Sequence, residues 1–66
     1  MEIKINGKKE SITKETTIAS ILEAKKVRPE MVAVEVNGEL IERESYKNHK
    51  LKDSDELEFL YYMAGG

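Results

Sequence analysis

The sequence predicts an α+β fold, a mixed sheet of four to five strands with one helix packed on one face. Three observations lead to this prediction. Apolar and polar residues alternate over 1–6 and 32–37, which is the period of a half-buried strand, and 57–62 is a run of apolar and aromatic residues rich in strand formers. Apolar residues within 18–22 recur at the helical period instead. The chain has 66 residues, which limits it to a single small domain.

Two tight hairpins are predicted by the Asn-Gly pairs at 6–7 and 37–38, because both residue types tolerate positive φ. The first pair joins the opening strand to a short strand at 8–12, whose lysines and glutamates suit the edge of a sheet. The second pair joins the middle strand to a short returning strand at 39–41.

The helix is expected to begin at Thr16 or Thr17, since a threonine hydroxyl can cap the first turn. It should end before Pro29, because proline disfavours helical geometry in the residue before it. We expect about two and a half to three turns, too short to be stable unless the helix lies on a sheet. Its buried face comprises Ile18, Ile21 and Leu22.

A long crossover is expected over 42–51, which shows no clean period. We expect a loop with one turn of helix, anchored by Tyr46 and Leu51. A polar turn at 52–55 then leads into the last strand at 57–62, which is rich in aromatic and apolar residues.

The inner faces of the first and last strands carry matching apolar residues, so these strands are placed side by side at the centre of the sheet. The middle strand lies next to them, and the helix covers this face. This arrangement is a β-grasp fold, the ubiquitin-like α+β class. Residues 1–62 form the domain, and 63–66 are expected to be a flexible C-terminal tail. The expected core comprises Ile3, Ile5, Ile18, Ile21, Leu22, Val34, Val36, Leu57 and Phe59.

Composition argues against several functions. There is no cysteine and only one histidine, His49, so neither a metal cluster nor a nucleophile with a histidine base is expected. The formal net charge of −2 argues against nucleic acid. No apolar run approaches the ~20 residues that cross a bilayer. We therefore expect a cytoplasmic, monomeric protein that binds no cofactor and is not an enzyme by itself.

The end of the chain carries the functional hypothesis. Met63 and Ala64 follow the last strand, and then Gly65 and Gly66 end the sequence. Glycine normally serves a turn or a helix cap, and neither applies to a terminal pair. The alternative is a frayed end with no role. We expect a thin arm, reaching at most about 13–14 Å, that presents the Gly66 carboxylate as the working group.

Together, the fold and the Ala64-Gly65-Gly66 ending make the chain similar to the ubiquitin-like sulfur carriers. It most resembles the ThiS family of thiamine (thiazole) biosynthesis, over essentially its whole length. The stretch 36–46 is similar to the family pattern of strand, turn, short strand and then Arg-Glu before an aromatic residue. The family often has proline where Glu42 stands and glycine where Ser54 stands, and both departures are mild.

This resemblance implies a mechanism. An E1-like, ThiF-like adenylating enzyme uses ATP and magnesium to convert the Gly66 carboxylate to an acyl-adenylate. Sulfur from a donor such as a cysteine desulfurase then gives a thiocarboxylate, which supplies sulfur to a ThiG-like thiazole synthase. The chain itself is acted on, and it holds neither nucleotide nor metal. Two glycines suit this role because they leave the carboxylate unhindered, and Ala64 belongs to the same tail.

Leu60 and Tyr62 are predicted to lie on the sheet face opposite the helix, beside the tail. Two exposed apolar residues together suggest a partner-binding patch, to which Met63 is assigned as well. The alternative is an ordinary exposed surface. Arg43 and Glu44 are assigned a structural role in the crossover loop.

Other functions fit the same ending. One is a MoaD-like carrier for molybdopterin or another thiolation pathway. A second is a ubiquitin-like modifier joined through Gly66 to substrate lysines. A third is a β-grasp binding module whose tail is never activated.

Overall fold

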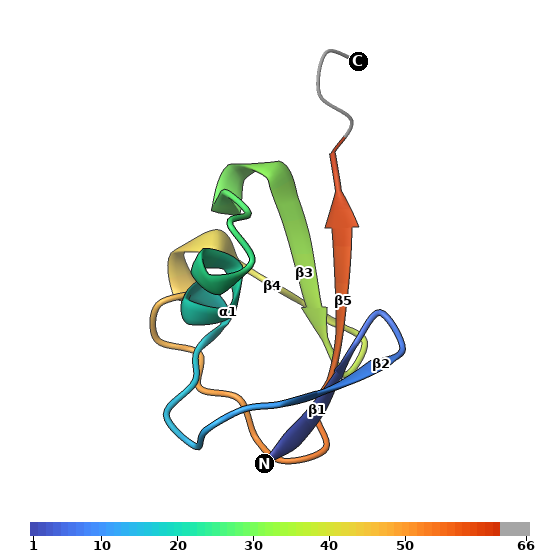
Figure 1. Cartoon of the computed structure of the whole chain (residues 1–66). Helices are drawn as coiled ribbons and strands as arrows, with labels where there is room; N and C mark the ends of the chain where they lie inside the picture. Colours follow the sequence, from blue (N-terminus) through green and yellow to red (C-terminus); the bar gives the residue numbers. More distant parts are fainter. Residues whose placement is uncertain (63–66) are drawn as a thin grey trace.

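The computed structural model describes residues 1–62, and it has the predicted α+β architecture: a five-stranded sheet with helix α1 on one face (Figure 1). The elements are β1 (Glu2–Ile5), β2 (Lys8–Ser11), α1 (Ile18–Ala24), the 3-10 helix η1 (Pro29–Met31), β3 (Val32–Val36), β4 (Glu39–Ile41), the 3-10 helix η2 (Arg43–Ser45) and β5 (Glu56–Tyr61).

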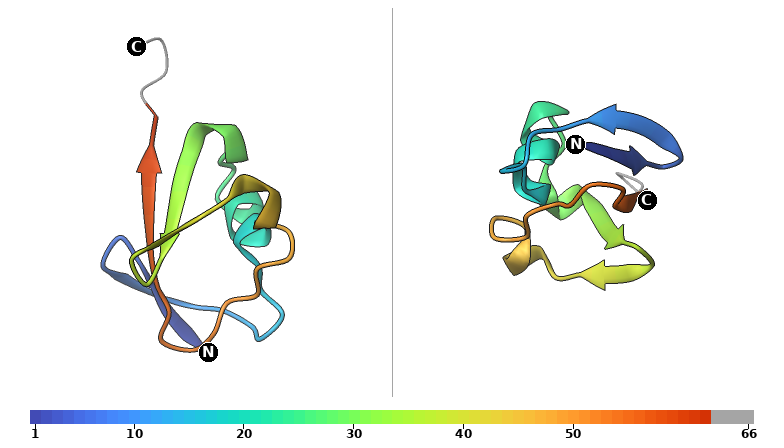
Figure 2. Two further views of the ribbon diagram at one scale, coloured as in Figure 1. Left: turned by 180° about the vertical axis from the view of Figure 1, so that it is seen from behind. Right: turned by 90° about the horizontal axis from the view of Figure 1, so that it is seen from below.

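The strand order is β2-β1-β5-β3-β4, so the first and last strands are neighbours at the centre, as predicted. β1 and β5 are parallel, whereas every other pair is antiparallel, which makes the sheet mixed. Two views at right angles show the layer of helices on one side of the curved sheet (Figure 2). Because β5 lies between β1 and β3 in the strand order, it has a hydrogen-bonded neighbour on each side.

Both Asn-Gly turns form as predicted. Asn6 and Asn37 have φ of 50° and 53°, and Gly7 and Gly38 both have φ of 85°. Positive φ at two successive residues matches the right-handed twist of the strands that each turn joins. The hairpin strands then pair in antiparallel register, β1 with β2 and β3 with β4.

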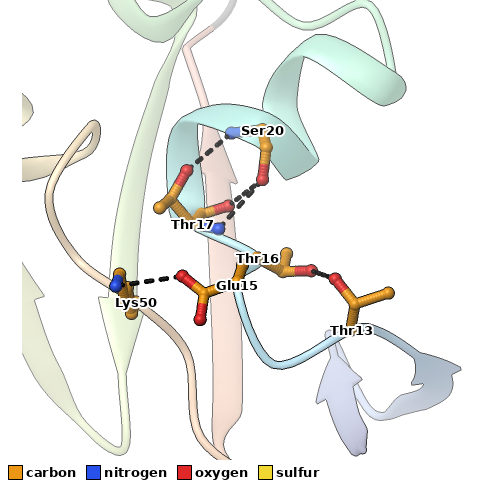
Figure 3. Close-up of polar contacts among 6 residues, drawn as sticks. All are labelled: Thr13, Glu15, Thr16, Thr17, Ser20 and Lys50. Carbon is orange, nitrogen blue, oxygen red and sulfur yellow. Dashed lines mark hydrogen bonds and ion pairs between the residues drawn. The ribbon is translucent and has the colours of Figure 1, made fainter.

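Thr17 caps the helix reciprocally with Ser20 (Figure 3). The Thr17 hydroxyl accepts a hydrogen bond from Ser20 N at 3.1 Å, and the Ser20 hydroxyl accepts one from Thr17 N at 2.9 Å. Of the two threonines predicted as caps, Thr17 is the one that serves. The preceding loop is tied by a Thr13–Thr16 hydroxyl contact of 3.1 Å.

The helix is shorter than predicted, with 7 residues or about two turns. The chain leaves the helix at Lys26, whose φ is 60°. Lys26 N donates to Glu23 O and Val27 N donates to Leu22 O, which is the hydrogen-bond pattern of a Schellman C-cap. A lysine stands where this motif usually has glycine, so no residue type in the sequence indicates the early end of the helix.

All nine predicted core residues are buried. Side chains from both sheet and crossover complete the core: Val32, Tyr46 and Leu51 are 2%, 4% and 2% exposed. Tyr46 and Leu51 thus anchor the crossover as predicted. In the turn before β5, Ser54 has φ of 72°, which explains why a glycine would suit this position.

Candidate functional site

β5 is the element that leads to the chain end, and it is held along its length. On one side it pairs with β3 from Val32↔Tyr61 to Val36↔Leu57. Beyond the strand, Tyr62 N still donates to Met31 O at 3.0 Å. In Figure 1 β5 points away from the N-terminus and ends at the far side of the domain. The backbone is therefore fixed up to Tyr62, the last described residue.

The first residue of each Asn-Gly turn also binds β5 through its side chain. Asn6 Oδ1 accepts from Phe59 N at 2.8 Å, on the β1 side of the strand. Asn37 Oδ1 accepts from Glu56 N at 2.9 Å, on the β3 side. Asn37 Nδ2 donates to Asp55 Oδ1 at 3.0 Å. These side chains extend the two backbone ladders, so both hairpin turns help to fix the start and middle of β5.

Asp55 is the one buried charged residue in the described chain, at 8% exposed. Its second carboxylate oxygen accepts a hydrogen bond from Lys52 N at 2.8 Å. With Asn37 on the first oxygen, the carboxylate is bound on both sides, which offsets the cost of its burial. The sequence placed Asp55 only in a polar turn, and its burial was not predicted.

An apolar patch covers the sheet face opposite α1, near the end of β5. Leu60 is 45% exposed and Tyr62 is 56% exposed, as expected for residues on this face. Leu60 is paired with Ala33 on β3, and Ala33 lines a groove together with Leu40 and Tyr62. Leu40 was missed from the sequence, although the adjacent pair Leu40-Ile41 in a strand must point to opposite faces. We call Ala33, Leu40, Leu60 and Tyr62 the outer patch.

Two acidic side chains face each other beside the outer patch. Glu35 on β3 lies directly opposite Glu58 on β5. Like charges at directly opposite strand positions destabilise a sheet. In the described residues neither glutamate belongs to an ion pair, since the two pairs found are Lys25–Glu10 and Lys50–Glu15. The outer face thus joins an apolar patch to a negative one.

The remaining predicted site residues, Met63, Ala64, Gly65 and Gly66, lie outside the described residues. Their assigned roles in partner binding and sulfur transfer stay predictions. Among residues 1–62 no group of three or more metal-ligating side chains is found. No helix in the same part of the chain is long and apolar enough to span a membrane.

The crossover between β4 and β5 holds the other residues considered in the sequence analysis. Arg43 and Glu44 lie in η2, exposed, and His49 supplies its backbone oxygen to Ile18 N at the start of α1. Tyr46 is buried beneath η2, and its hydroxyl donates to Val32 O at 3.5 Å. Burial raises the pKa of the Tyr46 phenol, because the charged form would lose its hydration.

Comparisons with known proteins cover nearly the whole chain. Residues 3–66 match the model of the ThiS family. The sulfur carrier protein ThiS of Bacillus subtilis is 34% identical over 65 residues, which are 97% of this chain and 98% of that protein. The crystal structure of the thiamine biosynthesis protein ThiS from Geobacter metallireducens is similar with a TM-score of 0.83, at 40% identity and with 100% of both chains covered.

A third relative is much longer. The chain is 32% identical over 66 residues to a thiazole synthase of Paramagnetospirillum magneticum, and it spans 20% of the length of that protein. The similarity thus covers one domain's length within a larger protein.

The mixed sheet, helix α1 on one of its faces and the central strand β5 define a small ubiquitin-like β-grasp protein. The match across the chain then gives the family: this chain belongs to the ThiS family.

Proposed function

We propose that this protein is the sulfur carrier for thiazole formation in thiamine biosynthesis, with Gly66 as the modified residue. The observation that carries the proposal is the similarity to ThiS proteins over nearly the whole chain, at 34% and 40% identity. The fixed course of β5 up to Tyr62 supports it, because the terminal residues follow directly from a rigid strand.

The proposed chemistry uses the terminal carboxylate as a nucleophile. A carboxylate oxygen attacks the α-phosphorus of ATP, pyrophosphate leaves, and an acyl-adenylate forms. The outer sulfur of a persulfide then attacks the acyl carbon and displaces AMP. A thiol cleaves the resulting S–S bond and releases the thiocarboxylate. The sequence contains no cysteine, so the sulfur has to be carried on the terminus and the thiols have to come from partners.

In this scheme the chain is a cosubstrate, and other proteins supply the catalysis. An E1-like adenylating enzyme holds ATP and magnesium, and a sulfur donor such as a cysteine desulfurase supplies the persulfide. The acceptor is a thiazole synthase. The similarity to one domain's length of a thiazole synthase supports this acceptor, because domains joined in one chain commonly act on one another's products.

The outer patch is the proposed docking surface for the adenylating enzyme. Two of its residues belong to the segment that leads to the terminus: Leu60 lies on β5 and Tyr62 follows that strand, and both are about half exposed. Met63 comes next in the sequence. A face with both apolar and acidic side chains favours a partner with an apolar surface and neighbouring positive charges. Glu35 and Glu58 would then lose their mutual repulsion on binding.

The chemistry is tested by intact mass. The protein is incubated with the adenylating enzyme, ATP, magnesium and a persulfide donor, and we expect a mass gain that corresponds to exchange of one oxygen for sulfur. A variant lacking Gly66 should gain nothing. An unchanged mass in the full-length protein, with pyrophosphate release also absent, would refute the proposal.

Docking is tested by Leu60→Glu, which should weaken binding to the adenylating enzyme and leave the thermal midpoint nearly unchanged. Ser11→Glu is the matched control, since Ser11 is an exposed strand residue away from the patch and the charge change is equal. Equal binding by both variants would remove the outer patch from the proposal.

The acceptor pathway needs its own experiment. The gene should restore growth of a thiamine auxotroph and fail to restore a molybdenum-cofactor mutant. Lysine conjugates of the intact chain in cell extract would instead favour the modifier function.

A further inference from the structure

The two Asn-Gly pairs have a chemical property that the proposed function does not use. Asparagine before glycine is prone to deamidation, because the following nitrogen is unhindered. The nitrogen of Gly38 attacks Cγ of Asn37 and gives up its proton to solvent. The new C–N bond closes a succinimide, the Cγ–Nδ2 bond breaks, and the departing nitrogen takes up a proton from solvent and leaves as ammonia. Water then opens the ring to aspartate or isoaspartate. No oxidant, reductant or metal is required.

In the folded protein the reacting amide of Asn37 is bound at both ends. Oδ1 accepts from Glu56 N at 2.9 Å, and Nδ2, the leaving group, donates to Asp55 Oδ1 at 3.0 Å. The Asn37 backbone is also held, since its N–H donates to Glu56 O at 2.7 Å. Ring closure turns Cγ toward Gly38 and breaks the side-chain contacts. The start of β5 therefore has to open before the reaction proceeds.

The deamidation product does not fit the site that the Asn37 side chain occupied. An aspartate at position 37 can still accept from Glu56 N, but it has no N–H for Asp55. Its carboxylate would instead lie against the Asp55 carboxylate, which is 8% exposed. Lys50 and Lys52 line the same hollow, but Glu39 lines it too, so the two lysines offset only part of this repulsion. Isoaspartate adds a further backbone atom to the tight turn and disrupts the backbone bond to Glu56 as well.

We propose that Asn37 is a modification site: its deamidation is held back by the folded start of β5, and its product weakens the lock between the β3–β4 turn and that strand. Each opening of β5 thus carries a chance of an irreversible change. The modification would accumulate as a chemical record of local unfolding in this protein.

Asn6 is an internal control with the same following residue and nearly the same φ. In the described residues the hydrogen bonds of its amide go to the main chain of Phe59, with Oδ1 accepting at 2.8 Å and Nδ2 donating at a long 3.4 Å. Conversion to aspartate keeps the shorter bond and loses the weaker one. Within residues 1–62 no carboxylate is hydrogen-bonded to this amide. Charged side chains of both signs line the same open hollow, namely Glu35, Glu56, Glu58 and Lys4. Deamidation at Asn6 should therefore be tolerated much better than at Asn37.

The first experiment measures the rate. The full chain is incubated at mildly alkaline pH, folded or in urea, and digested peptides are scored by mass for the conversion of each amide. We expect Asn37 to react roughly ten-fold or more slowly in the folded protein, because the reaction needs local opening. Equal rates in the folded and unfolded chain would overturn the gating.

The second experiment measures the consequence with Asn37→Asp, Asn6→Asp and the double variant Asn37→Asp/Asp55→Asn. We expect Asn37→Asp to raise the unfolding constant about ten-fold, from one lost charged hydrogen bond and a new like-charge contact. Asn6→Asp should change it by less than about three-fold, within the range of surface substitutions. The double variant exchanges donor and acceptor, so it should recover most of the loss. Equal effects of both single variants, or no recovery in the double variant, would overturn the proposed product defect.

Discussion

Leu57 and Leu60 lie three residues apart on β5 and face opposite sides of the sheet. Leu57 is 3% exposed and belongs to the core, whereas Leu60 is 45% exposed on the outer patch. The same substitution to alanine should therefore have two different effects. At Leu57 it removes buried methyl groups and leaves a cavity, which costs about 2–5 kcal/mol. At Leu60 the side chain keeps much of its hydration after folding, so we expect a loss below about 1 kcal/mol.

The size of the domain sets the scale of this difference. At about 0.05–0.15 kcal/mol per residue, a chain of 66 residues has a free energy of unfolding of about 3–10 kcal/mol. Leu57→Ala removes a large share of that and should lower the urea midpoint strongly, or leave the protein partly unfolded at 25 °C. Leu60→Ala should keep the midpoint close to that of the unchanged protein.

The assay is urea unfolding followed by circular dichroism, with binding to the adenylating enzyme measured calorimetrically on the folded variants. Under the proposed docking, Leu60→Ala weakens binding while its stability is retained. A stability loss at Leu60 as large as that at Leu57 would show that both faces of β5 are packed, and the assignment of the outer patch as a free surface would be wrong.

Three further predictions concern the backbone, the helix cap and a buried phenol. Lys26→Gly and Ser54→Gly should each raise the free energy of unfolding by up to about 1 kcal/mol in urea titrations, because φ of 60° and 72° strains a residue with Cβ. Destabilisation by both would refute this reasoning. Thr17→Ala should cost about 1 kcal/mol, measured in the same way, since it removes the acceptor for Ser20 N, and no loss would show the cap to be unimportant. The pKa of Tyr46 is raised above 10.0 in the fold, so the unfolded chain releases this proton first. The contribution of the neutral phenol to stability is present below pH 10.0 and is lost as pH rises through the folded pKa. In Tyr46→Phe the free energy of unfolding should therefore fall less steeply at alkaline pH than in the unchanged protein. Parallel pH profiles of the two proteins would contradict this prediction.

The strands and the core could be predicted because their signals are local and periodic. Val32 to Val36 alternates in sequence and alternates in burial, and the Asn37-Gly38 turn follows from the residues that form it. The order of the strands also followed, since the first and last strands carry matching apolar faces and both need neighbours. For the candidate site, the alternation of side chains along the last strand placed Leu60 and Tyr62 on the exposed face of the sheet.

The features that were not predicted depend on contacts between distant residues. Asp55 is buried because Asn37, 18 positions away, meets it across the β3–β5 register. The helix ends early because Lys26 adopts positive φ. Packing of Val27 against the core supports this conformation, whereas lysine itself has no preference for it. Leu40 became part of the outer patch only once the register of β4 was known.

The arrangement of β5 connects stability to the proposed function. Binding energy gained at the outer patch can assist a reaction at the terminus only if the chain between them is fixed, because a mobile connection would leave the carboxylate free to explore many positions. Up to Tyr62 that connection has backbone partners along its β3 side, whereas β1 pairs with it only at Glu56 and Leu57. The side chains of Asn37 and Asn6 add hydrogen bonds at its start and middle. Four residues then remain, which span at most about 13–14 Å. Under the proposed function, a partner bound to the outer patch would therefore receive the Gly66 carboxylate within a small volume, which would raise the effective concentration of the carboxylate at the nucleotide. A carrier of this kind thus needs a firmly held strand before its terminus, whereas a binding module would need only an exposed surface.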